Sequence, residues 1–220
     1  MKKSFVCIIG VFLISFFSLA PPAFASDHAD PMNLKRLESG INDLFVFPDG
    51  DRIVTVLTVR RALTQSSGLK LDPYTYRINM DLHSQVSYDN AVDLGRYGGT
   101  IETPEKISSD LTIELQLNDD TTLKKQDITG LTSSDDVEIW TGIRDDPFIF
   151  PNFFGTNVVA MVVSIPAEAF PTGQQDWLVW ATSHKGRKQI DHVGRSNRTM
   201  LPRLDALNTI PPNKQAATIK

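Results

Sequence analysis

Apolar and polar residues alternate along two segments of the chain. The apolar positions of the first segment are Tyr74, Tyr76, Ile78 and Met80, and those of the second are Leu111, Ile113, Leu115 and Leu117. Successive side chains of a strand point to opposite faces, so a period of two is typical of a strand with one buried face. Both segments are therefore predicted to be strands that line a core.

Three further segments are apolar at nearly every position and rich in β-branched residues. They cover residues 53–59, 157–165 and 177–181. Such runs predict strands that are buried on both faces. Shorter candidate strands lie at 44–47 and 137–142.

Turn residues separate these segments, as in Pro48-Asp49-Gly50 and Asn118-Asp119-Asp120. No long amphipathic helix stands between them, which argues against alternating strand–helix units. We therefore expect an all-β fold, an antiparallel β-sandwich that forms a single domain over residues 26–220. Short helical turns are expected at 33–38 and 200–207, and residues 211–220 are expected to be a frayed tail.

Residues 1–25 have the pattern of a secretory signal peptide. Lys2 and Lys3 precede an apolar run that ends at Leu19, and Ala23-Phe24-Ala25 is a small–x–small cleavage pattern. We expect a bacterial periplasmic or secreted protein with no membrane span in the mature chain. Cleavage also removes Cys7, the only cysteine, which excludes disulfides and thiolate chemistry in the mature protein.

Composition and charge narrow the function classes. The 220 residues are 41% hydrophobic with a formal net charge of −4, so no basic excess points to a nucleic-acid partner. The chain contains no G-x-G-x-x-G, Walker A, H-E-x-x-H, G-x-S-x-G or EF-hand pattern. A small-molecule or protein partner remains open.

The expected mature N-terminus reads Ser26-Asp27-His28. A terminal amine, two backbone amide nitrogens and the imidazole of the third residue offer four nitrogens in a plane, which suits Cu(II) or Ni(II). The alternative is that His28 is a structural residue bonded to Asp27 or Asp30. The structural interpretation is preferred.

Arg144, Asp145 and Asp146 follow a predicted strand and precede Pro147. Two adjacent carboxylates there could help to bind Ca²⁺, a weaker cofactor hypothesis than Cu(II) or Ni(II). The preferred interpretation is a turn in which the aspartates cap backbone amides and Arg144 pairs with one of them.

Asp191, His192 and Arg195 form a polar group around Gly194. Arg195 could bind an anion, or it could tie the C-terminal segment to the sandwich through an acidic residue such as Asp145; the tie is preferred. The aromatic run at 147–154 is either a cover for the core or the rim of an apolar binding site.

Five stretches resemble a bacterial family of exported proteins, the one catalogued as domain of unknown function 4331. They are Ser26-Asp27-His28-Ala29-Asp30, Asp43-Leu44-Phe45-Val46-Phe47-Pro48, Arg144-Asp145-Asp146-Pro147-Phe148, Val179-Trp180-Ala181-Thr182 and Asp191-His192-Val193-Gly194-Arg195. The resemblance implies a β-rich exported fold and no established reaction. The chain departs from the family pattern at His192, where arginine is expected.

Two functions are consistent with these observations. The first is an exported binding or structural protein, with Cu(II) or Ni(II) binding at the mature terminus as a special case. The second is a periplasmic hydrolase with acid–base groups from His28, Asp145 and His192. The first is favoured because the sequence contains no recognised catalytic motif.

Overall fold

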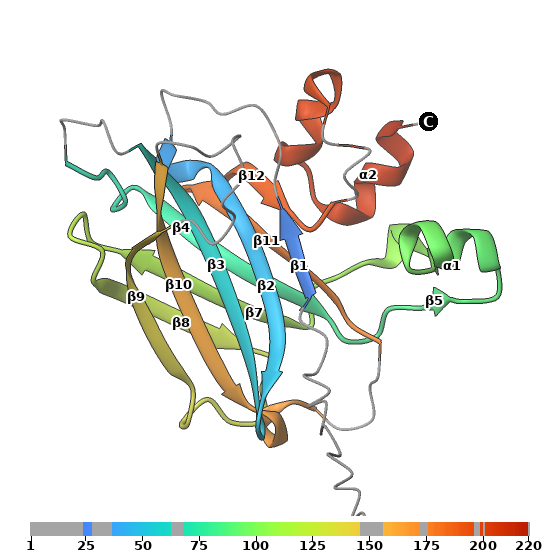
Figure 1. Cartoon of the computed structure of the whole chain (residues 1–220), viewed down its shortest axis with the longest axis horizontal. Helices are drawn as coiled ribbons and strands as arrows, with labels where there is room; N and C mark the ends of the chain where they lie inside the picture. The colour runs from blue at the N-terminus through green and yellow to red at the C-terminus, as the bar shows by residue number, and fades with distance from the viewer. Residues whose placement is uncertain are drawn as a thin grey trace, which may run out of the picture.

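Two five-stranded antiparallel sheets pack face to face in the computed structural model (Figure 1). The structure describes residues 24–27, 37–62, 68–145, 156–171, 176–195, 199 and 201–219. The predicted all-β antiparallel sandwich with short helices is therefore confirmed. No helix in these ranges is both long enough and apolar enough to cross a membrane.

Sheet A has the strand order β1-β2-β3-β10-β9. Its strands are β1 (Phe24–Asp27), β2 (Ile41–Asp49), β3 (Arg52–Ala62), β10 (Thr156–Pro166) and β9 (Glu138–Asp145). Every neighbouring pair in this sheet is antiparallel.

Sheet B has the strand order β12-β11-β4-β7-β8. Its strands are β12 (Lys188–Val193), β11 (Leu178–Lys185), β4 (Tyr74–Asp81), β7 (Leu111–Leu117) and β8 (Leu123–Thr129). The two segments with alternating polarity are thus β4 and β7, neighbours at the centre of this sheet.

The core lies between the inward faces of the two sheets. From sheet B, the alternating residues Tyr76, Ile78 and Met80 of β4 are fully buried, as the sequence predicts. From sheet A, Leu57 and Met161 face them within one apolar cluster. The other face of β3 and β10 is partly buried, because Val54, Val158 and Ala160 are buried while Val56 and Val162 are half-buried.

Cross-strand pairing corrects one predicted boundary. The strand expected at 137–142 continues to Asp145, because Arg144 and Asp145 pair with Val158 and Asn157 of β10. Arg144 and Asp145 therefore belong to β9 and do not form the turn that we expected after it. The sequence gives no sign of this extension, because the pairing partner lies in a distant segment.

A long excursion joins β4 to β7 over residues 82–110, and we call it the arm. It contains β5 (Val86–Ser87), α1 (Ala91–Tyr97), β6 (Thr100–Ile101) and η2 (Pro104–Lys106), and α1 projects from the side of the sandwich in Figure 1. The Asn90 side chain caps the first turn of α1, and Gly98 ends the helix at φ 78°. A helix of seven residues is too short for its period to be recognised in the sequence.

The C-terminal segment folds back over β12 as η6 (Pro202–Thr209) and α2 (Pro212–Ile219). The helical turn predicted at 200–207 is confirmed in η6, and η1 (Leu37–Ser39) lies at the end of the one predicted at 33–38. One more short helix, η4 (Ala167–Ala169), follows β10.

The frayed tail predicted for residues 211–220 was wrong. Gln215 of α2 places its Nε2 2.7 Å from His192 Nδ1 and donates to the Leu207 carbonyl over 3.2 Å. Gln189 of β12 donates to the carbonyls of Asn208 and Ile210. Residues 212–219 form a helix, and one of the polar residues that suggested a solvated tail, Gln215, holds it beside β12.

Candidate functional site

Asp191 and His192 are adjacent in β12 and face opposite sides of sheet B. Asp191 faces sheet A, where its Oδ2 accepts a hydrogen bond from the Ile41 amide of β2 (2.8 Å). His192 is buried beside Gln215 of α2. Asp191 thus joins the two sheets. Because the Asp191 and His192 side chains lie on opposite faces of sheet B, they do not form one site.

Arg195 ties the C-terminal segment to the sandwich, as the preferred interpretation of the sequence predicts. Its Nη1 donates to the Thr199 carbonyl (2.9 Å), and its Nη2 donates to Asn208 Oδ1 (2.6 Å). These partners are neutral oxygens rather than the carboxylate of Asp145. Gly194 lets the chain reach this position because it adopts φ +99° directly against β11.

Asp145 lies apart from the Asp191–Arg195 group. Ile41, the partner of Asp191, stands level with Ile143 of β9 across sheet A, but β3 and β10 lie between them. Three strand spacings amount to about 14 Å. Arg144 instead donates to the Ile143 carbonyl over 2.7 Å at the exposed end of β9.

The metal-binding predictions fall largely outside the described residues. Ser26 and Asp27 belong to β1, where their backbones face Leu44 and Asp43 of β2. His28, Asp30, Asp146 and the aromatic run at 147–154 lie outside the described residues. Within the described part of the chain, no three His, Cys, Asp or Glu side chains group as a metal ion would require.

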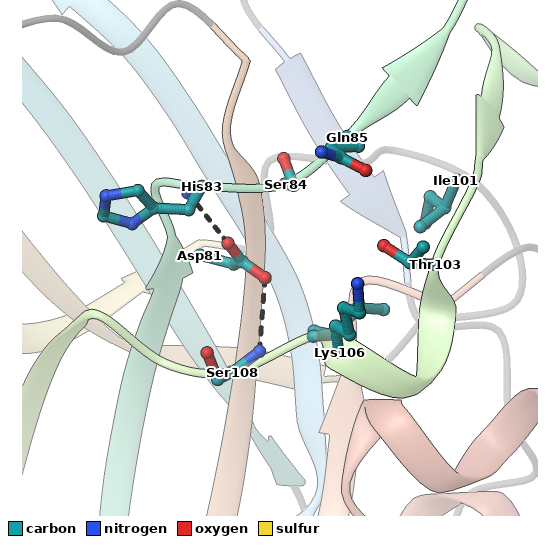
Figure 2. A pocket seen from close by; sticks show the side chains of 9 residues that line it. Asp81, His83, Ser84, Gln85, Ile101, Thr103, Lys106 and Ser108 are labelled. Carbon is teal, nitrogen blue, oxygen red and sulfur yellow. Dashed lines mark hydrogen bonds between the residues drawn. The ribbon is translucent and has the colours of Figure 1, made fainter.

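A cleft of about 210 Å³ opens where the arm leaves the sandwich (Figure 2). One wall is the chain that leaves β4, residues 81–85, and the other is the chain that returns to β7, residues 101–108. The lining residues are Asp81, His83, Ser84, Gln85, Ile101, Thr103, Lys106, Ile107 and Ser108. Most of them are polar, and only the two isoleucines are apolar.

Asp81 joins the two walls at the floor of the cleft. It is the last residue of β4 and only 4% exposed. Its Oδ1 accepts from the His83 amide (2.9 Å), and its Oδ2 accepts from the Ser108 amide (3.2 Å). One carboxylate thereby accepts a hydrogen bond from a backbone amide of each wall. It fixes the distance between the two chain segments where the arm leaves the sandwich.

A second aspartate, Asp110, holds His83 where the arm returns to β7. Asp110 Oδ2 accepts from the Leu82 amide (2.8 Å) and from His83 Nδ1 (2.9 Å). The hydrogen bond to Asp110 and its negative charge raise the pKa of His83. Burial favours a higher pKa for Asp110, but hydrogen bonds from the ring and amide of His83 and from Leu82 outweigh burial and lower it. Figure 2 shows the imidazole pointing away from the cleft.

Lys106 supplies the positive charge of the cleft. It ends the short helix η2, and its amine points toward Thr103 and the cleft space in Figure 2. Among the described residues, the ion pairs do not include Lys106. A buried carboxylate and an ammonium outside those ion pairs therefore line the same small space, together with hydroxyl and amide groups.

Neighbouring elements hold the arm in place. Ser84 Oγ donates to the Asp176 carbonyl (3.1 Å), and the Tyr88 hydroxyl donates to Asp176 Oδ1 (2.9 Å). On the other side, α2 packs against η2, the helix that carries Lys106. Both walls are thus supported from outside the arm, which favours a site that keeps its shape.

A buried histidine lies away from this cleft, on β11. His184 is 7% exposed and shares a hydrogen bond with Thr182 Oγ1 (2.9 Å). Its Nδ1 has no hydrogen-bond partner in the described structure. Burial and then the charge of Arg77 lower the pKa of His184 to about 4, against a smaller opposing effect of Glu114.

No family model, curated protein or solved structure matches the chain. The resemblance noted in the sequence therefore gains no support from relatives, and function has to be argued from the site.

Sequence reasoning missed the cleft. Its walls lie in a connection that has neither a strand period nor a helical one. One signal was available: Asp81 directly follows the alternating residues of β4, and Asp110 directly precedes those of β7. Paired aspartates at the ends of two neighbouring strands indicate a connection held by backbone caps.

Proposed function

We propose that this chain is an exported binding protein that holds a small polar ligand in the cleft between Asp81 and Lys106. The observation that carries the proposal is that these opposite charges face one cleft without pairing with each other. Unpaired charge in a concave site is a common feature of ligand recognition. The sandwich and the C-terminal segment act as the scaffold.

Binding is favoured over catalysis by the arrangement of the titratable groups. The ring of His83 is bonded to Asp110 and points away from the cleft, while the hydroxyl of Ser84 donates to the Asp176 carbonyl. A hydrolytic serine would need a base within hydrogen-bond reach of its hydroxyl. No observation favours the alternative acid–base set of His28, Asp145 and His192.

Export is part of the same proposal. It rests on the signal pattern of residues 1–25 and on the absence of cysteine after Cys7. Copper or nickel binding at Ser26-Asp27-His28 is a separate hypothesis, which would add a second ligand without involving the cleft.

Filling the cleft tests the proposal. Ile101→Trp adds bulk to a cleft wall at a side chain that is 37% exposed, and Ile143→Trp makes the same change on β9, where the isoleucine is also 37% exposed. Amide NMR spectra are recorded while mixtures of amino acids, polyols and small organic acids are added. We expect the wild type and Ile143→Trp to show shifts at Thr103, Lys106 and Ser108, and Ile101→Trp to lose them. Equal shifts in all three proteins, or none in the wild type, would refute the proposal.

A further inference from the structure

The charges of the cleft restrict which ligands it can satisfy. A carboxylate has about four acceptor positions, and two of those on Asp81 are used by the His83 and Ser108 amides. Asp81 lines the cleft, and its remaining positions suit a donor such as an ammonium group. The Lys106 ammonium has about three donors and no ion pair with another described residue, so it suits a carboxylate.

From this arrangement we infer that the ligand is a small zwitterion of the amino-acid class, bound with its ammonium group on Asp81 and its carboxylate toward Lys106. The inference rests on the proposed binding role of the cleft and names its ligand class. Hydroxyl and amide groups of Ser84, Gln85 and Thr103 also line the cleft, and Figure 2 shows Thr103 near Lys106 and the other two on the opposite wall. They offer hydrogen bonds to a polar side chain.

The size of the cleft agrees with a molecule of this kind. Its volume of about 210 Å³ equals the share of about seven waters in the liquid. That is below the roughly 300–1,000 Å³ of pockets for larger organic ligands. A single amino acid matches this volume, whereas an oligosaccharide or a nucleotide would extend outside the cleft.

Ligands with one kind of charge fit less well. A phosphate or a simple anion would bind Lys106 but would face the carboxylate of Asp81, which is 4% exposed and cannot turn away. A divalent cation would have one carboxylate and would be repelled by Lys106. Only a ligand of mixed charge compensates both groups at once.

L-Serine and two of its fragments test the inference on protein purified after export. 3-Hydroxypropionate lacks the ammonium group of serine, and ethanolamine lacks its carboxylate, while both keep the hydroxyl. Binding is followed through the amides of Thr103, Lys106 and Ser108 in NMR titrations. We expect serine to bind about tenfold or more tightly than either fragment, because each fragment leaves one cleft charge unpaired.

Lys106→Gln provides the matched change in the protein. It should weaken serine binding about tenfold or more without weakening ethanolamine binding, because ethanolamine has no group for the lysine and its ammonium group is no longer repelled. Lys125→Gln, an exposed lysine of β8 outside the cleft, should change neither. Lys106 is exposed, so its replacement does not threaten folding as a change at Asp81 would.

The outcomes separate this inference from the proposed function. Equal affinity for serine and its fragments, or unchanged serine binding by Lys106→Gln, overturns the zwitterion assignment. If glycerol or another uncharged polyol shifts the cleft amides and serine does not, the binding role stands and the ligand class is wrong. If no probe shifts them, both proposals fall.

Discussion

Gly194, within the Asp191–Arg195 group, occupies a backbone position that only glycine fits without strain. It adopts φ +99°, and a Cβ built there would lie 2.9 Å from both Trp180 Cβ and the Val179 carbonyl oxygen. Gly194 therefore meets two constraints, an unfavourable φ and a close approach to β11. The sequence marked this glycine as conformationally special but could not show what it packs against.

The two constraints can be separated by comparing two glycines. Gly186 also has a positive φ, +57°, but nothing lies within 4 Å of its Cβ position. We expect Gly186→Ala to lower the free energy of unfolding by about 1 kcal/mol and Gly194→Ala to lower it by about 2–4 kcal/mol, because the clash is added. Urea denaturation of both variants measures the difference. Equal losses would mean that the contact with Trp180 and Val179 relaxes freely.

His184 should make stability depend on pH. Its folded pKa of about 4 lies below the ordinary 6.5, so the unfolded chain binds more protons between these values. Stability attributable to His184 is therefore complete above pH 6.5 and is lost as the pH falls toward 4. Because solvent partly screens the site, we expect a loss of about 1–2 kcal/mol.

The control for His184 is a residue that keeps the hydrogen bond and does not titrate. His184→Gln retains a partner for Thr182, and its unfolding free energy should fall less between pH 7 and pH 4.5 than that of the wild type. The raised pKa of His83 acts in the opposite direction in both proteins and cancels in the comparison. Parallel pH profiles would show that His184 is not the group responsible.

At the scale of elements, the sequence is most informative where the period is long enough to be recognised. The alternation at Tyr74–Met80 and Leu111–Leu117 predicts β4 and β7 because one face of each is buried against sheet A. The same reasoning fails for α1 and α2, which have seven and eight residues. The caps of α1 and the packing of α2 on η2 and beside His192 hold these helices, and neither feature produces a period.

Helix α2 connects the C-terminus to the candidate site. It is anchored through Gln215 to the buried His192, and it packs on η2, which carries Lys106. A chain that ends at Pro211 should keep the sandwich but loosen η2. The reporters are the Lys106 and Ile107 amides, which donate to Thr103 and Pro104 within the arm.

Hydrogen exchange distinguishes this local effect from general destabilisation. In the shortened chain we expect about tenfold or faster exchange of the Lys106 and Ile107 amides, which corresponds to about 1.4 kcal/mol of local opening. The Thr121 amide, in the β7–β8 turn, should exchange as in the wild type. Faster exchange at all three amides would instead mean that α2 stabilises the whole fold.

At the scale of the whole molecule, strand order decides which distant segments meet. Asp27 faces Asp43 at the start of β2, and Asp191 bonds Ile41 two residues away, so β1 and β12 both approach the start of β2. Asp145 reaches the same end of sheet A but lies across β3 and β10. Composition and period predict a sandwich, but they do not predict the order of its strands. The sequence therefore singled out polar residues without showing which of them come together.

Ser26 and Asp27 cannot pair fully with β2 and chelate a metal ion at the same time. As part of β1 they pair with Leu44 and Asp43 of β2, and adjacent residues of an antiparallel strand alternate between bonded and free amides. Chelation of Cu(II) or Ni(II) needs the amine of Ser26 and the amides of Asp27 and His28 together. Cleavage after Ala25 would also remove Phe24 and Ala25, half of β1. We therefore expect metal binding to release the rest of the strand.

Titration of Cu(II) into protein with the processed N-terminus tests this prediction. The wild type should bind one ion, and the Leu44 amide should exchange faster once β1 is released. The Asp43 amide donates to Thr58 Oγ1 of β3 and should exchange as before. His28→Ala removes the imidazole, and one extra residue before Ser26 moves His28 to the fourth position without deleting a side chain. Both changes should weaken binding, and affinity for the wild type should fall as the pH drops because binding displaces protons. Equal tight binding by all three proteins would place the metal elsewhere and leave His28 with a structural role.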